Sequence, residues 1–202
     1  MTTEPEAVWA ALRPHVEWAQ GFSPIFLFAD HPAPVRAIKH LLADSLKLRT
    51  PRLQDHAPAT AEAAAALAEA LLHSRPGPAD GPVWLELWRE PATPGWQAAR
   101  AGLLHRLNER RYLLEQHLRR PLLVVLPTAA RGRVHEDAPD LWAVRSFSAQ
   151  LPNPQPAPPS ASPRVQHPSG RPALSTRLHP RPPPPPPRVQ HPSGRPALST
   201  LA

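Results

Sequence analysis

The chain has 202 residues, including 32 prolines and no cysteine. This length suffices for one domain of ordinary size with an extension. The lack of cysteine excludes disulfides, thiolate catalysis and zinc sites with cysteine ligands.

Charge and proline content divide the chain near residue 150. Residues 1–150 contain 17 basic and 16 acidic residues, whereas residues 151–202 contain six arginines, 17 prolines and no acid. The C-terminal segment also has no aromatic residue, so it lacks the apolar surface needed to offset the entropy of ordering. We therefore expect a nearly neutral domain over residues 1–150 and a disordered tail over residues 151–202.

The sequence has no recognisable targeting or membrane signal. The first twenty residues have early acids and no apolar core, and no apolar run reaches the length needed to span a bilayer. We therefore expect a soluble, cytoplasmic protein.

The N-terminal elements follow from apolar spacing. Helical periodicity predicts a helix over residues 6–20, in which Pro14 causes a kink or an early end. The apolar run at residues 25–29 predicts a strand buried on both faces. Leucine-type residues three or four apart then predict a helix of about four turns over residues 35–48, which begins once the prolines stop. A short strand is expected at residues 49–54.

The following elements alternate in the same way. Thr60 is a candidate N-cap for an alanine-rich helix that ends at residue 72. The segment VWLELW at residues 83–88 predicts a strand, and residues 96–118 predict the longest helix. LLVVLP at residues 122–127 predicts a third strong strand.

Residues 141–147 are expected to form a further strand or an aromatic edge segment. Strands that alternate with helices favour right-handed crossovers between parallel strands. We predict an α/β fold with three layers, in which helices flank a mostly parallel sheet of four to five strands, followed by the disordered C-terminal tail.

The loop ADHPAP at residues 29–34 stands where many nucleotide-binding proteins hold a phosphate. It has no glycine, and its two prolines have no N–H to offer an anion. Asp30 would repel phosphate, and Lys39 lies inside the following helix. We expect no phosphate site of the Walker type, although the helix N-terminus could attract an anion through its dipole. The favoured interpretation is that Asp30 and the prolines set the turn.

Glu86 is a candidate catalytic residue, because a carboxylate near the end of a buried strand could bind magnesium as in nucleotide hydrolases. Glu90, just past the strand, could do the same. A buried glutamate needs a partner, and Arg110, Arg111 and Arg145 are candidates. We favour a structural ion pair for Glu86 over a catalytic role.

Other chemistry has little support in the sequence. The histidines are spread singly, and no metal-binding spacing such as HExxH is present. His31 and residues 135–137 follow predicted strands and could form a weak polar site with Asp30 and Asp140. We favour solvated loop residues and predict no metal site.

Three segments carry a resemblance to a known family. They are Leu107–Arg110, the strand at residues 123–127, and Ala138–Trp142 with Val144–Ser146. Over about residues 20–150 the chain resembles the N-terminal P-loop-NTPase-like domain of bacterial multidomain proteins of the STAND ATPase type, which often carry tetratricopeptide repeats. The resemblance implies an α/β core used as a switch or scaffold in a signalling or defence protein, here in a degenerate or truncated form.

The tail contains an internal duplication. PRVQHPSGRPALST occurs at residues 163–176 and again at residues 187–200. Between the copies, RPPPPPPR favours a stiff polyproline II segment in which Arg181 and Arg188 match proline-recognition patterns. A linker or a recent genomic duplication is the favoured interpretation. The arginines could add weak, salt-sensitive binding to nucleic acid or anionic surfaces.

The leading hypothesis is a non-enzymatic, nucleotidase-like regulatory or protein-interaction module with an unknown protein partner and no cofactor. Trp88, Trp96 and Trp142 are candidate contact or packing anchors, and packing is favoured. Arg181 and Arg188 are candidate contacts in the tail. The sequence leaves open whether the chain is an enzyme, and it favours a protein without catalytic activity.

The rival hypothesis is a regulator that binds or hydrolyses a nucleotide at a non-standard phosphate site. In that case Glu86 or Glu90 would be catalytic, and Asp30, His31 and Arg145 would bind ATP with magnesium. The two hypotheses differ in whether Glu86 serves stability or nucleotide affinity.

Overall fold

A computed structural model describes residues 4–47, 49, 51–74, 77, 80–90 and 92–153. The predictions for the tail, including those for Arg181, Arg188 and the duplicated segment, lie outside these residues. Within the described residues, no helix is long and apolar enough to cross a membrane.

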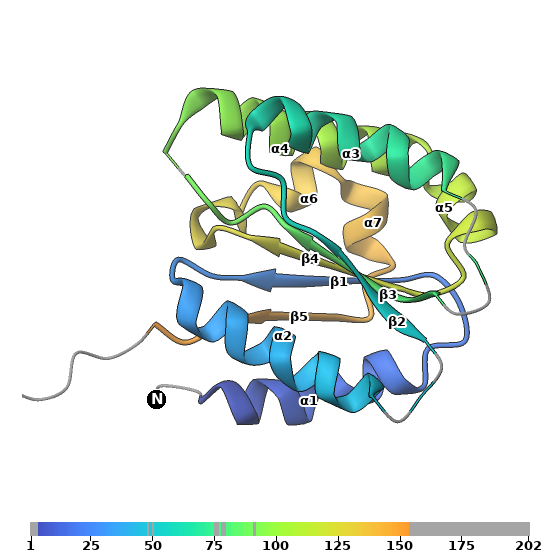
Figure 1. Cartoon of the computed structure of the whole chain (residues 1–202). Helices are drawn as coiled ribbons and strands as arrows, with labels where there is room; N and C mark the ends of the chain where they lie inside the picture. Colours follow the sequence, from blue (N-terminus) through green and yellow to red (C-terminus); the bar gives the residue numbers. More distant parts are fainter. Residues whose placement is uncertain are drawn as a thin grey trace, which may run out of the picture. The chain divides into compact units, whose positions relative to one another are not determined.

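Five parallel strands form one sheet at the centre of the domain (Figure 1). They are β1 (Ser23–Phe28), β2 (Arg52–His56), β3 (Asp80–Glu86), β4 (Pro121–Leu126) and β5 (Phe147–Gln150), in the order β2-β3-β4-β1-β5. The central strands are continuous apolar runs because helices cover both of their faces.

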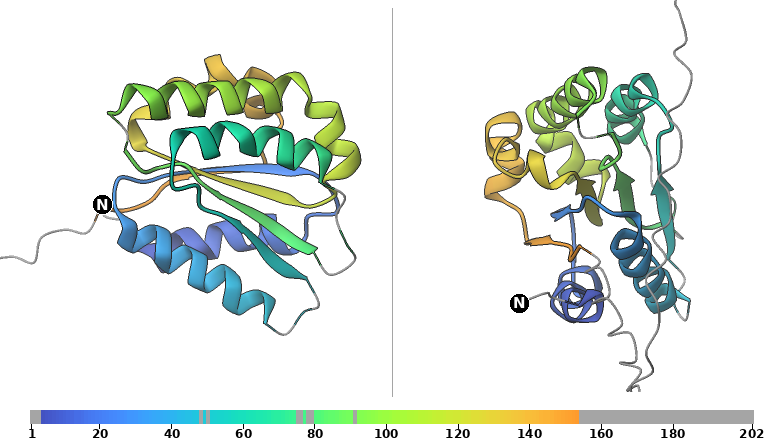
Figure 2. Two further views of the ribbon diagram at one scale, coloured as in Figure 1. Left: turned by 45° about the horizontal axis from the view of Figure 1, so that its top comes forward. Right: turned by 90° about the vertical axis from the view of Figure 1, so that its left-hand side faces the viewer.

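Helices cover the sheet on both sides, as Figure 2 shows. One face carries α1 (Pro5–Glu17) and α2 (Pro32–Leu46). The other carries α3 (Ala61–His73), α4 (Pro94–Glu109), α5 (Arg111–His117), the 3₁₀ helix η1 (Thr128–Ala130), α6 (Val134–Asp137) and α7 (Pro139–Ala143). The predicted three-layer α/β fold is therefore confirmed.

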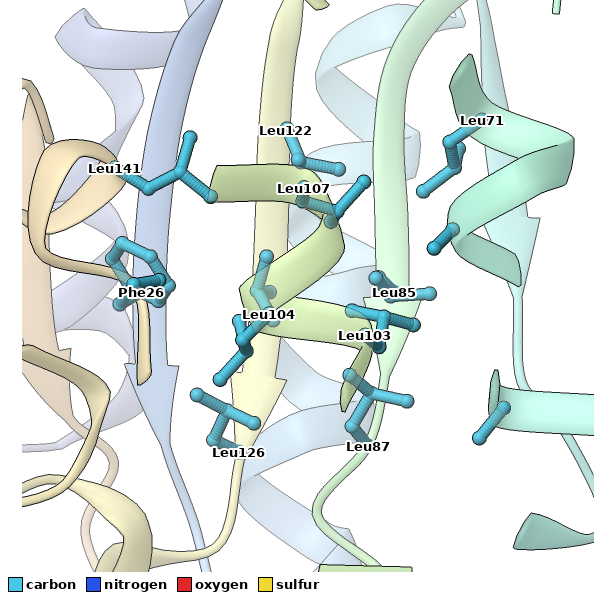
Figure 3. Packing of buried hydrophobic residues seen from close by; sticks show 14 of the residues in the cluster. Phe26, Leu71, Leu85, Leu87, Leu103, Leu104, Leu107, Leu122, Leu126 and Leu141 are labelled. Atoms are coloured by element: carbon cyan, nitrogen blue, oxygen red, sulfur yellow. The ribbon is translucent and has the colours of Figure 1, made fainter. Parts of the chain in front are cut away.

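The core has two halves because successive side chains of a strand point to opposite faces. Trp84, Leu123 and Val125 lie on the side of α1 and α2. Phe26 and Leu85 belong to the other half, against α3 and α4. Figure 3 shows leucines of α4 lying over leucines of β3 and β4. Burial of each such leucine contributes roughly 1.5–3 kcal/mol.

The structure corrects three of the predicted elements. The long helix is interrupted at Arg110, whose backbone leaves the helical region, so α4 and α5 are separate. The helix after β1 begins at Pro32 rather than after the prolines, because proline is tolerated in a first helical turn. Leu141 and Trp142 lie on α7, and the last strand begins at Phe147.

Because all strands run in one direction, the sheet has a carboxyl edge, where the strands end, and an amino edge, where they begin. β1 and β4 are neighbours. The chain leaves β1 toward α2 on one face and leaves β4 toward η1 and α6 on the other (Figure 1). Ligands of open α/β sheets bind at such a switch point, outside the carboxyl ends of the strands.

Candidate functional site

The switch point at the carboxyl edge is occupied by an aspartate of the chain itself. Asp30, directly after β1 and Ala29, accepts a hydrogen bond from the Thr128 N–H, 3.0 Å away at the start of η1. The carboxylate therefore takes a backbone donor that an anion at this position would need. The Thr128 Oγ1 atom is buried and makes no hydrogen bond within the described part of the chain.

The N-terminus of α2 offers few donors to an anion. His31 is its N-cap residue, exposed and without a side-chain hydrogen bond to the helix. Pro32 and Pro34 occupy the first and third helical positions and lack an N–H group. Since anion binding at a helix start uses these N–H groups, the dipole of α2 is poorly equipped for it.

Glu86 lies at the end of β3 and accepts hydrogen bonds from α2 and from its own strand. Its carboxylate, 8% exposed, lies 2.7 Å from Lys39 Nζ on α2 and accepts a hydrogen bond of 3.1 Å from Trp84 Nε1. Lys39 Nζ also lies 2.7 Å from an oxygen of Asp55 on β2. A more distant contact of 3.6 Å joins Glu86 to Arg89. One ammonium group thus bridges two carboxylates at the ends of neighbouring strands.

The predicted ion pair of Glu86 exists, but the predicted partners were wrong. Side chains alternate along β3, so Glu86 points toward α2, while Arg110 and Arg111 follow α4 on the opposite face. Arg111 instead pairs with Glu115 at 3.1 Å. Arg145 lies before β5, at the amino edge. The actual partner, Lys39, could be placed inside a helix from the sequence, but its pairing with Glu86 was not predicted.

The ion pair shifts both of its titratable groups toward the charged form. Burial alone would raise the pKa of Glu86, but the hydrogen bond and charge of Lys39 outweigh it, and the pKa lies below its usual value. Burial alone would lower the pKa of Lys39, yet Asp55 and Glu86 together raise the pKa above its usual value. The pair is therefore ionised at neutral pH.

A buried arginine holds the loop that follows β3. The Arg100 guanidinium, from α4, donates to the carbonyl oxygens of Leu87 at 3.2 Å, Arg89 at 2.9 Å and Glu90 at 3.3 Å. Glu90 has a left-handed backbone with φ of 46°, and its carboxylate accepts a hydrogen bond from Thr93 Oγ1 at 3.3 Å. The second candidate carboxylate therefore belongs to a turn that Arg100 fixes in place.

Sequence reasoning missed Arg100, although a signal was available. It lies one helical turn after Trp96 and one turn before Leu103, on the apolar stripe of α4. A charged residue on a buried stripe needs several hydrogen-bond acceptors. The carbonyl groups after β3 supply them.

The residues that carry the family resemblance have structural roles here. Asn108 Oδ1 accepts hydrogen bonds from the N–H groups of Asp140 at 2.8 Å and Leu141 at 3.0 Å, and so caps the start of α7. Arg145 stacks on the Trp142 ring at 3.8 Å from its centroid and donates to the Trp142 carbonyl. The LNER and APDLW segments, about thirty residues apart, are thus joined by a helix cap.

The three candidate contact tryptophans are packed to different degrees. Trp96 is buried, and Trp142 is half-buried against the aromatic rings of Phe26 and Phe28. Trp88 is half-buried, and its buried indole N–H contributes to lowering the pKa of Glu86. The exposed tryptophan is Trp18, at 76%, which directly follows α1 and was not singled out from the sequence.

A cavity of about 60 Å³ lies at the carboxyl edge beside the end of β4. Gln97 and Arg100 of α4 form one wall, and Pro127, Ala130 and Arg133 belong to the other. Small-molecule pockets typically measure roughly 300–1,000 Å³. This cavity is therefore too small for a nucleotide.

The structure does not bring the rival set of nucleotide ligands together. Asp30 and His31 follow β1 at the carboxyl edge, whereas Arg145 precedes β5 at the amino edge. Among the described residues, no group of three or more histidine, aspartate and glutamate side chains could hold a metal ion. No protein-family model matches the chain, and no curated protein is significantly similar to it.

Proposed function

We propose that residues 1–150 form a non-enzymatic, nucleotidase-like regulatory or protein-interaction module of the type used in bacterial signalling or defence proteins. The observation that carries this proposal is the 2.7 Å ion pair between Lys39 and Glu86. A carboxylate that activates magnesium must offer its oxygens to the metal. Glu86 instead offers one oxygen to an ammonium group and an indole N–H.

The other groups at this edge support the same proposal. Asp30 bonds the backbone N–H at the switch point, and Glu90 is part of a turn held by Arg100. A phosphate at the switch point would have to displace the Asp30 carboxylate, and a metal at Glu86 would have to displace Lys39. The first displacement would break the hydrogen bond between Asp30 and the Thr128 N–H, and the second would break the ion pair between Lys39 and Glu86.

Calorimetric titration of ATP and of GTP, each with magnesium, into the full chain tests the proposal. We expect no saturable heat and no thermal shift up to about 1 mM nucleotide, a concentration that detects even weak binding. Saturable binding in the micromolar range would overturn the proposal and establish the rival, nucleotide-binding function.

Two variants make the titration decisive. Glu86→Gln removes the charge of the carboxylate but keeps its shape, and we expect it to lower stability without changing the nucleotide titration. Asp30→Ala frees the Thr128 N–H, and we expect it to gain no phosphate binding because the α2 N-terminus lacks two donors. A nucleotide affinity that Glu86→Gln alters contradicts the structural role of Glu86.

A further inference from the structure

The amino edge of the sheet carries a groove whose charged side chains are mostly basic. Two adjoining hollows, of about 550 Å³ and about 210 Å³, share Leu46, Arg49 and Pro51. The larger extends along the C-terminal end of α2 toward Leu53 of β2. The smaller continues to Arg120 and the starts of β3 and β4. We call the two hollows together the amino-edge groove.

The groove has an excess of positive charge. Among the described residues that line it, five are basic, namely Lys47, Arg49, Arg52, Arg119 and Arg120, and two are acidic, namely Glu17 and Asp80. The net charge of this lining is thus three positive. The cations here outnumber the carboxylates that could neutralise them.

The two carboxylates are already engaged by neighbouring groups. Glu17 pairs with Arg13 at 2.8 Å and with Arg49 at 3.4 Å. Asp80 accepts a hydrogen bond from the Gly77 N–H and lies 3.7 Å from Arg120. Lys47 pairs with Asp44 of α2 at 2.6 Å. With Lys47, Arg49 and Arg120 engaged, two cations of the groove are left for a ligand.

Arg52 and Arg119 are those two cations. Both side chains are exposed, and neither has an ion pair or a hydrogen bond within the described part of the chain. Arg52 begins β2, and Arg119 lies just before β4. An anionic ligand in the groove would therefore gain two unpaired guanidinium groups, which bind carboxylates in a bidentate manner.

The groove also has an apolar component. Leu46 and Leu53 are half-buried and pack against the core beneath α1 and α2. Trp18 is 76% exposed and stands in the chain between Glu17 and Ala19, which both line the groove. Exposed tryptophan together with arginine is the side-chain combination enriched at the energetic centres of protein interfaces.

We propose that the amino-edge groove binds an acidic peptide segment of a partner protein, with apolar side chains between its carboxylates. This inference rests on the proposed interaction function and names the surface and the chemistry of the partner. Charge complementarity selects the acidic segment, and the leucines and Trp18 select apolar side chains within it.

The charge of the groove argues against two other occupants. The tail of the same chain has six arginines and no acid, so its charge matches that of the groove and repels it. Nucleic acid is disfavoured because the groove offers only two unpaired cations among its described lining residues, whereas binding to a phosphate backbone depends on many basic side chains.

The test is fluorescence anisotropy with a labelled twelve-residue peptide of alternating glutamate and leucine, and the matched peptide of alternating lysine and leucine as control. The protein is the full chain, so that the basic tail is the same in every variant. The groove variant is Arg52→Glu with Arg119→Glu. The control variant is Arg36→Glu with Arg133→Glu, which changes the net charge equally at exposed positions away from the groove.

We expect the acidic peptide to bind saturably and the groove variant to weaken binding at least tenfold. The control variant should change the affinity less than about threefold, the scale of a general charge effect. Trp18→Ala should also weaken binding, without any change in charge. Thermal midpoints equal to that of the wild type will show that each variant is folded.

Three outcomes would overturn the groove assignment. They are no saturable binding of the acidic peptide, an equal loss in the groove and control variants, or tighter, groove-dependent binding of a labelled single-stranded oligonucleotide. None of them involves a nucleotide titration. Failure of the groove assignment and failure of the proposed non-enzymatic function are therefore distinguishable, because only micromolar ATP or GTP binding overturns the latter.

Discussion

Lys39 and Lys47 stand eight residues apart, within α2 and just past its end, and each forms an ion pair of similar length. Lys39 lies 2.7 Å from Glu86, and Lys47 lies 2.6 Å from Asp44. Their surroundings differ, because Glu86 is 8% exposed, whereas Asp44 is 58% exposed and Lys47 is 72% exposed. Although the two distances are similar, we expect the buried pair to contribute more to the stability of the fold than the exposed pair.

The same difference extends to the two edges of the sheet. At the carboxyl edge, Lys39 and Arg100 are bonded to carboxylates and carbonyl groups of neighbouring elements. At the amino edge, Arg52 and Arg119 have no such partners in the described part of the chain. The paired charges of Lys39 and Arg100 contribute to the fold, and the two unpaired charges at the amino edge are available to a partner. The edge that usually binds ligands in α/β proteins is thus the less available one.

Replacing Lys39 should have the largest effect on stability. Lys39→Met leaves the buried Glu86 carboxylate without its counterion, and we expect a loss of about 2–4 kcal/mol in the free energy of unfolding. Lys47→Met, the matched change near the other end of α2, should make no measurable difference. Urea denaturation of both variants at pH 7 measures the two effects, and losses of equal size would contradict the contrast between the edges.

Replacing Arg100 should have the second-largest effect on stability. Arg100→Met preserves much of the buried stem but removes donors to three carbonyl groups, and we expect a loss of about 2 kcal/mol. The control is Arg106→Met on the same helix, whose partner Glu69 lies 3.6 Å away at the surface. Hydrogen exchange should also show faster opening of the loop after β3 in Arg100→Met alone. A loop that stays protected would mean that other contacts hold it.

Much of the sheet could be predicted because its strands are local apolar runs. The strand at residues 25–29 and the strand at residues 122–127 needed only their own sequence, since parallel strands covered on both faces are apolar throughout. The partner of Glu86 could not be found in this way. It depends on which face of β3 the side chain occupies, and on which helix covers that face, both of which are set by distant packing.

The region around α7 shows the same limit. Leu141 and Trp142 suggested a strand because the segment is short and aromatic. Their helix is only five residues long, from Pro139 to Ala143, and an isolated helix of that length is unstable. It is capped by Asn108, which is more than thirty residues away in sequence. No local pattern could indicate a helix that a remote side chain stabilises.

Removing that cap should have a smaller effect than removing Arg100. Asn108→Ala frees the N–H groups of Asp140 and Leu141, and we expect a loss of about 1 kcal/mol. Asn108→Asp should retain most of the stability, because a carboxylate oxygen can accept both hydrogen bonds and favours a helix N-terminus. Thermal unfolding of the two variants gives the comparison. Equal destabilisation by alanine and aspartate would show that the amide N–H of Asn108, and not its oxygen, is the important group.

Replacing His56, which ends β2 at the carboxyl edge, should have the smallest effect on stability. We expect this effect to be visible only in how the free energy of unfolding depends on pH. Burial lowers the pKa of His56 in the folded protein below its usual value, and the charge of Asp55 offsets this only in part. The unfolded chain therefore binds a proton at a higher pH than the folded chain does, so stability is complete above the usual value of 6.5 and falls as pH decreases through it. His56→Gln does not titrate, and the stability difference between wild type and this variant should shift against the wild type between pH 8 and pH 5. A difference that is constant across this range would mean that the imidazole is as accessible to protons in the folded state as in the unfolded one. The carboxyl edge would then be more open to solvent than its ion pairs imply.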